Sequence, residues 1–134
     1  MKTNQQLILA LLVGVAVGLI TARAIAAQEA KPAPAYVIAE VEPDPAKPAD
    51  PAALRKYSEE APKTIAAFGG QYLIRGNKAE TVEGDISKGR IAVIAFDSLE
   101  KARGWYFSPA YEAFKPIRQN STKSRILIVE GVAR

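Results

Sequence analysis

Two residue types are missing from this chain of 134 residues: it contains no cysteine and no histidine. Without cysteine, disulfides, thiolate nucleophiles and cysteine-ligated metal clusters are excluded. Without histidine, the protein also lacks the usual general base, the usual haem ligand and the commonest transition-metal ligand. We therefore expect no metal site and no resident cofactor.

The excess of basic over acidic residues is also small. The formal net charge is +4, but Lys2 and Arg23 lie in an N-terminal segment that we expect to be removed, which leaves 16 of the 18 basic residues against 14 acidic ones. The basic side chains alternate with acids along the sequence and form no cluster. Because a nucleic-acid site needs a contiguous basic face, we expect no binding to DNA or RNA.

Residues 1–26 have the three parts of a secretory signal peptide. Lys2 supplies the positive start, residues 7–20 are uncharged and almost wholly apolar, and residues 24–26 (Ala-Ile-Ala) give a small-x-small cleavage pattern. The apolar run is 14 residues, shorter than the roughly 20 that span a bilayer as a helix. An uncleaved membrane anchor is the alternative. We expect cleavage, export to the periplasm and no stable membrane span afterwards.

The mature chain begins with a short leader and continues as one domain. Residues 27–34 are rich in alanine, proline and charge without any periodicity, which is typical of a disordered leader. The remaining residues, 35–133, have the length of a single domain, since single domains commonly run about 100 to 150 residues. We therefore expect one folded domain over 35–133.

Four strands and two main helices are predicted in this domain. Asp50 and Pro51 have the residue types of a helix N-cap and first helical position. Pro62 is expected to interrupt and kink that helix, and two glycines end it. β-Branched, apolar and aromatic content predicts the strands. The strands are expected at residues 36–41, 71–75, 90–96 and 125–130.

The second helix is expected to open directly after the third strand. Asp97, followed three residues later by Glu100, resembles a capping box. Ser108 is most simply the N-cap of a further helical turn, which Pro116 is expected to limit. The order of elements is therefore strand, helix, strand, strand, helix, strand.

This order is the βαββαβ arrangement of ferredoxin-like α+β domains, with a four-stranded antiparallel sheet and both helices on one face. A sheet with its other face in water alternates apolar and polar residues, but residues 91–96 and 126–129 are apolar at consecutive positions. The second face therefore needs cover, and no further segment of the chain is left to supply it. We expect a symmetric homodimer that forms through the sheet face.

A pocket in this topology would open between sheet and helices or between subunits. Glu83 and Arg90 flank a glycine-containing loop, so they can approach as a carboxylate–guanidinium pair. Such a pair either anchors an anionic substrate or supplies a general base, or it is an ordinary ion pair that closes a hairpin. The candidate pocket residues are Tyr57, Thr64, Tyr72, Glu83, Arg90, Trp105, Tyr106, Tyr111 and Arg118.

The aromatic candidates and Arg118 each have a structural interpretation as well. Four aromatic residues cannot all face one direction on a helix, so they serve either a substrate-stacking pocket or the core and dimer interface. They are Trp105, Tyr106, Phe107 and Tyr111. Arg118 either binds a phosphate or carboxylate, or reaches back to the carbonyls that end its own helix. Both pairs of alternatives stay open on the sequence alone.

Several motifs along the mature chain carry a family resemblance: residues 36–40, 66–72, 82–85, Arg90 with Phe96, 102–106, 108–111, 115–118 and 129–131. With these motifs, the sequence from Tyr36 to Val132 resembles the domain-of-unknown-function 1330 family, which is placed among the dimeric α/β-barrel proteins. The resemblance implies a ferredoxin-like protomer that dimerises through its sheet, and no established activity. Looser relatives include cofactor-independent monooxygenases, lactone isomerases and haem-handling enzymes, and the histidine ligand of the last group has no equivalent here.

These observations predict an exported, dimeric domain that binds a small, partly apolar or anionic molecule, with Arg90 or Arg118 as its anchor. If the protein transforms this molecule, it does so without a cofactor, by proton transfer or oxygenation that uses Glu83, Tyr72 or Tyr106. The alternative is a non-catalytic structural or interaction protein whose aromatic residues only form the core and the dimer interface.

Overall fold

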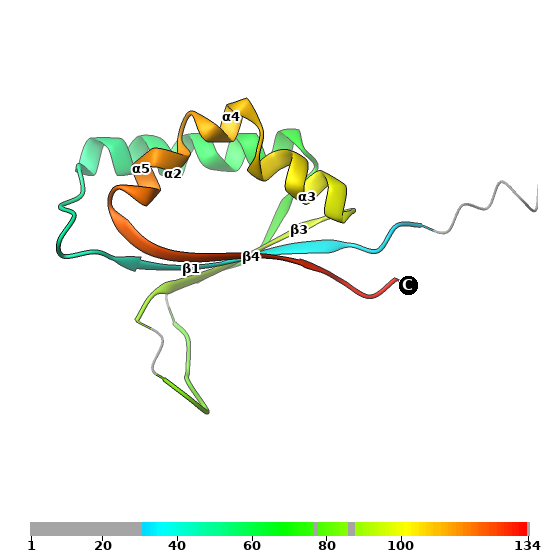
Figure 1. Ribbon diagram of the computed structural model, residues 1–134, viewed down its shortest axis with the longest axis horizontal. Helices are drawn as coiled ribbons and strands as arrows, with labels where there is room; N and C mark the ends of the chain where they lie inside the picture. Colours follow the sequence, from blue (N-terminus) through cyan, green and yellow to red (C-terminus); the bar gives the residue numbers. More distant parts are fainter. Residues whose placement is uncertain (1–30, 77, 86–87, 134) are drawn as a thin grey trace, which may run out of the picture. The chain divides into compact units, whose positions relative to one another are not determined.

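The computed structural model describes residues 31–76, 78–85 and 88–133. The predicted signal peptide lies outside these residues. The described part confirms the predicted α+β, ferredoxin-like fold: a four-stranded antiparallel sheet in the order β2-β3-β1-β4, with the helices on one face (Figure 1). The elements are β1 (Ala35–Pro43), α2 (Pro51–Ala67), β2 (Gln71–Gly76), β3 (Arg90–Phe96), α3 (Leu99–Tyr106), α4 (Pro109–Glu112), α5 (Lys115–Gln119) and β4 (Thr122–Glu130).

The strand register decides which side chains face the helices. On β1, Val37 pairs with Ile94 of β3 on one side and Ile128 of β4 on the other. Strand β2 carries an irregularity, because Tyr72 pairs with Ile94 whereas Ile74 pairs with the next residue of β3, Val93. One extra residue is thus inserted in β2, as in a β-bulge.

The core lies where α2 and α3 cover the sheet, and Trp105 is at its centre. The indole is 3% exposed and its ring centroid lies 5.7 Å from that of Phe96 and 4.3 Å from that of Tyr111. Ile65 of α2 is buried in the same cluster. Aromatic rings at these separations contribute favourable contacts beyond the area they bury. The packing of α3 on the sheet is therefore centred on one side chain.

Three details of the predicted helices were wrong. Helix α2 runs from Pro51 to Ala67 without the interruption predicted at Pro62. The N-cap of α3 is Ser98, whose hydroxyl accepts from the Lys101 amide at 3.2 Å, whereas the Asp97 carboxylate pairs with the Lys101 ammonium at 2.8 Å. Serine and aspartate are both good caps, so composition alone could not separate adjacent positions. Pro116 does not limit a helix but lies in the first turn of α5, where its missing N–H leaves no bond unmade.

The sheet face opposite the helices is apolar and has no cover within the described residues. Leu73, Ile74, Leu127 and Val129 on this sheet are 41–56% exposed. Residues 78–85 are exposed and extend from the sheet on the side away from the helices (Figure 1). No helix in the described part of the chain has both the length and the apolar character needed to cross a bilayer.

Candidate functional site

A cavity of about 730 Å³ lies between the sheet and the helices that cover it. Its floor is the helix-side face of the sheet, with Val37, Ala39 and Ile126 among the lining residues, and Leu54 of α2 contributes to its walls. Binding pockets for small molecules commonly range from about 300 to 1,000 Å³ and are mostly apolar. The size and lining of this cavity therefore fit a small organic molecule.

Most of the predicted site residues lie around this cavity, and two do not. Thr64 lies behind the wall, where its hydroxyl accepts from Trp105 Nε1 at 3.0 Å and donates to the Ala61 carbonyl at 2.8 Å. Glu83 is exposed in the segment 78–85 and does not line the cavity. The residues that line it are Tyr57, Tyr72, Arg90, Trp105, Tyr106, Tyr111 and Arg118.

The charged residues that line the cavity are all basic. No aspartate or glutamate of the described chain is among the lining residues. Arg55, Arg75 and Lys88 were missed by the sequence analysis, because basic residues that alternate with acids along the chain show no cluster until the fold selects them. The basic lining residues are Arg55, Arg75, Lys88, Arg90 and Arg118. The lining favours a ligand of negative charge.

Arg118 differs from the other basic residues because it is buried. Its side chain is at the cavity wall but the residue is only 6% exposed, and neither Nε nor Nη2 has a hydrogen-bond partner among the residues that the structure describes. A buried, unsatisfied donor on a charged group is costly, and native structures retain few of them. The guanidinium therefore has two donors that are closed to solvent and have no acceptor among the described residues.

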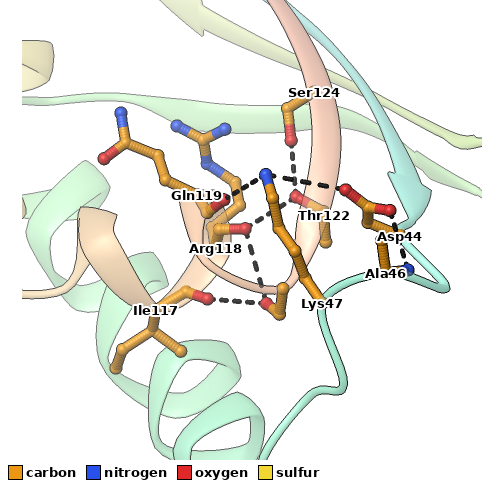
Figure 2. Close-up of polar contacts among 9 residues, drawn as sticks. Asp44, Ala46, Lys47, Ile117, Arg118, Gln119, Thr122 and Ser124 are labelled. Atoms are coloured by element: carbon orange, nitrogen blue, oxygen red, sulfur yellow. Dashed lines mark hydrogen bonds and ion pairs between the residues drawn. The ribbon is translucent and has the colours of Figure 1, made fainter.

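The carbonyls at the end of α5 do not supply that acceptor, because other donors occupy them. In Figure 2 the guanidinium of Arg118 points away from Asp44 and Lys47, and no interaction is drawn to it. The helix-end alternative for Arg118 is thus not the arrangement in the structure. The occupied carbonyls are Ile117 O, bonded by Ser121 Oγ at 2.6 Å, Arg118 O, bonded by Thr122 Oγ1 at 2.7 Å, and Gln119 O, bonded by Lys47 Nζ at 3.4 Å.

Two tyrosines connect Arg118 to the cavity. The hydroxyls of Tyr57 and Tyr111 lie 3.0 Å apart, and both tyrosines are electrostatic neighbours of the Arg118 guanidinium. Burial alone would lower the pKa of Arg118, but the tyrosines around it outweigh burial, and the pKa is raised. Arg118 is therefore charged at every physiological pH.

Burial, and next the neighbouring Tyr111, raise the pKa of Tyr57 far above its ordinary value, although Arg118 acts in the opposite direction. Burial also raises the pKa of Tyr72, against the opposing charge of Arg75. Both hydroxyls thus stay protonated near neutral pH. They can donate hydrogen bonds, but neither is a ready general base.

We expect Tyr57 to remain protonated in the folded protein at a pH where free tyrosine, with a pKa of about 10, ionises. Because the folded pKa is the higher one, the stability that comes from the protonated hydroxyl is complete below about pH 10 and is lost as the pH rises above it. The measurement is tyrosinate absorbance of the wild type minus that of Tyr57→Phe. Half-ionisation of Tyr57 at or below pH 10 in the folded protein would contradict this prediction.

The arrangement is suited to holding an anion and to stabilising negative charge on oxygen. Arg118 and the tyrosine hydroxyls supply donors in a partly water-excluded site, where such donors act most strongly. Within the described residues no group of three or more aspartates and glutamates is placed to hold a metal ion. The described lining supplies donors and positive charge but no carboxylate base.

Solved structures with the same fold come from several organisms. A protein of unknown function from Rhodopseudomonas palustris matches with a TM-score of 0.61 and 17% identity, over 86% of this chain and 93% of that chain. A hypothetical protein from Arabidopsis thaliana has a TM-score of 0.55 and 15% identity, over 81% and 96%. SnoaB, a cofactor-independent oxygenase from Streptomyces nogalater, has a TM-score of 0.53 and 9% identity, over 76% and 96%. At these identities the likeness shows the fold alone.

The comparison with curated proteins gave no match. The model of the family described as "Domain of unknown function (DUF1330)" matches residues 34–132. That range contains every cavity-lining residue described above. The chain belongs to the DUF1330 family, whose ferredoxin-like fold here encloses a basic, aromatic cavity.

Proposed function

We propose that this protein binds a small, partly apolar anion in the cavity between the sheet and the helices. The observation that carries the proposal is the buried guanidinium of Arg118, which lines a cavity without carboxylates and has two donors without partners in the described chain. A native protein rarely retains such donors without a role. The exposed basic residues at the same cavity, Arg55 and Lys88 among them, attract the anion from solution.

Binding, and not a named reaction, is the function that the site supports best. SnoaB shares the fold and acts as an oxygenase without a cofactor, but a shared fold does not transfer an activity. The donors of Arg118 and Tyr57 would stabilise an oxyanion if the bound molecule formed one. Of the residues named for proton transfer, Tyr72 and Tyr106 line the cavity and Glu83 does not.

The proposal includes a homodimer that forms through the uncovered sheet face. Leu73 and Leu127 on this sheet are 56% and 41% exposed, and exposed apolar surface of this kind marks an interaction site. Strands β1, β3 and β4 carry apolar residues on both faces, as expected of a sheet that is covered twice. A second copy of the same face is self-complementary under two-fold symmetry.

The proposal also places the mature protein outside the cytoplasm. Its support is the N-terminal sequence, with a positive start, a 14-residue apolar run and a small-residue cleavage pattern. An exported protein without cysteine keeps its fold in either redox environment. The ligand would accordingly be a molecule of the periplasm.

Native mass spectrometry of the protein from a periplasmic extract, without added ligand, tests these statements together. We expect the mass of residues 27–134, a two-chain assembly and a reproducible small-molecule adduct. A chain that retains residues 1–26 would contradict cleavage, and a monomer at micromolar concentration would contradict the homodimer. Each mass therefore decides one statement without depending on the other two.

A cavity-filling variant tests whether the adduct is bound in the proposed cavity. Ala39 lies on the cavity floor, so Ala39→Phe should abolish the adduct while the protein stays folded. The matched control is Ala66→Phe, which changes an exposed position of α2 that does not line the cavity, and it should retain the adduct. An adduct that survives Ala39→Phe, or wild-type protein that stays bare and takes up no anion, would favour the structural alternative.

A further inference from the structure

The two unsatisfied nitrogens of Arg118, Nε and Nη2, form one particular edge of the guanidinium. Their N–H bonds are parallel and lie in one plane, because the group is planar and delocalised. Two parallel donors in a plane match the two oxygens of a carboxylate, which is why arginine binds carboxylates bidentately. The third nitrogen, Nη1, is not one of the unsatisfied atoms.

The pair of tyrosine hydroxyls beside Arg118 can add one more donor. The hydroxyls of Tyr57 and Tyr111 lie 3.0 Å apart, and either one can donate to the other. When Tyr111 donates to Tyr57, the Tyr57 hydroxyl keeps its own proton for a further acceptor. Because the pKa of Tyr57 is raised, that proton is present throughout the physiological range.

The residues that line the cavity indicate the chemistry of the part of the ligand that does not bind Arg118. Tyr106, Tyr111 and Trp105 line the cavity, and the sheet floor is apolar. Among the basic residues of the described lining only Arg118 is buried, so one positive charge lies among the aromatic rings, whereas Arg55, Arg75, Lys88 and Arg90 are exposed. A phosphate carries about −1.5 to −2 at neutral pH, so its second charge would remain buried among aromatic rings at a cost. A monocarboxylate on an apolar or aromatic skeleton leaves no such charge.

We infer that the ligand is a monocarboxylate with an apolar or aromatic body, whose carboxylate is held by the Nε–Nη2 edge of Arg118 with a further hydrogen bond from Tyr57. This inference rests on the proposed function and names the class of its ligand. Both nitrogens of this edge are closed to bulk water, and side chains at binding sites commonly change rotamer on binding. A turn of the long Arg118 side chain presents the edge to the cavity that the residue already lines.

The test uses paired probes and the intact purified protein. The probes are 3-phenylpropanoate and octanoate, the primary amide of each, and 2-phenylethylphosphonate. Binding is measured by isothermal titration calorimetry and by the fluorescence of Trp105, the one tryptophan of the sequence. At least one carboxylate should bind at least about 10-fold more tightly than its own amide, since a hydrogen-bonded charge contributes about 1.5 to 3 kcal/mol.

Arg118→Lys is the decisive variant, because it keeps the charge and removes the two parallel donors. We expect it to weaken carboxylate binding about 10- to 100-fold. Tyr57→Phe should weaken it about 2- to 10-fold, the effect of one neutral hydrogen bond. The matched control is Arg103→Lys, the same change at an exposed position that does not line the cavity, and it should leave the affinity unchanged.

The outcomes separate this inference from the proposed function. Equal binding of a carboxylate and its amide, full affinity in Arg118→Lys, or tighter binding of the phosphonate would overturn the carboxylate assignment while anion binding in the cavity still stands. If none of the anions binds and the purified protein carries no adduct, both the inference and the proposed function are wrong.

Discussion

Replacing Trp105 by alanine is expected to lower the free energy of unfolding by about 3–5 kcal/mol, the usual cost of truncating a buried aromatic residue. The indole is 3% exposed, packs against Phe96 and Tyr111, and donates to the Thr64 hydroxyl at 3.0 Å. Since small domains are stable by only about 5–15 kcal/mol, this one change removes a large share of the total. The measurement is chemical denaturation followed by far-ultraviolet circular dichroism.

Two controls decide whether the effect comes from the packing of Trp105. Phe107→Ala removes a ring from the same helix end, but that ring is 59% exposed, so the expected cost is no more than about 1 kcal/mol. Trp105→Phe keeps most of the buried ring and loses the bond to Thr64, which should cost about 1 to 2 kcal/mol. If Trp105→Ala cost as little as Phe107→Ala, the indole would not be the centre of the core.

The fold was predictable because each element carries its own local signal. The four strands are apolar or β-branched runs, and Asp50 with Pro51 marks the start of α2, where the aspartate accepts from the Ala52 amide at 2.9 Å. Together these signals predict one order of helices and strands, βαββαβ, which is the ferredoxin-like topology. Adjacent alternatives, such as Ser98 or Asp97 as a cap, could not be separated because both residue types serve.

The site was predictable in its residue types more than in its geometry. Aromatic and basic residues were selected by their chemistry, and seven of them line the cavity. Arg75 was missed because the extra residue in β2 brings Tyr72 and Arg75 to the same cavity, and strict alternation would place them on opposite faces. Thr64 was named for the pocket but supports Trp105 from behind, a role that depends on the packing of α2 against α3.

The lack of hydrogen-bond partners for Arg118 Nε and Nη2 in the described chain could not be predicted from the sequence. The sequence left two roles open for the Arg118 side chain, a bond to the carbonyls that end α5 or a bond to an anion. Which role applies depends on the other donors that reach those carbonyls, and these donors belong to Lys47, Ser121 and Thr122. Lys47 lies 72 residues from the carbonyl that it reaches. Only the tertiary structure brings this competitor into place, and it leaves the guanidinium to the cavity.

Replacing Arg118 by methionine is expected to stabilise the ligand-free protein and to abolish anion binding. The residue is 6% exposed with two unsatisfied donors, so an apolar side chain of similar length removes a buried charge whose cost is only partly repaid. We expect a gain of about 1–3 kcal/mol in the free energy of unfolding. For a domain of about 100 residues this raises Tm by at least about 4 °C.

The two effects together distinguish a binding residue from a structural one. A residue that holds a ligand at the expense of stability gives a more stable but inactive protein when it is replaced, which is the usual trade-off at functional sites. Arg103→Met, the same change at an exposed position, should alter neither stability nor binding appreciably. If Arg118→Met instead lowered Tm, the guanidinium would be stabilising the core through Tyr111. The main support for an anionic ligand in the cavity would then be lost.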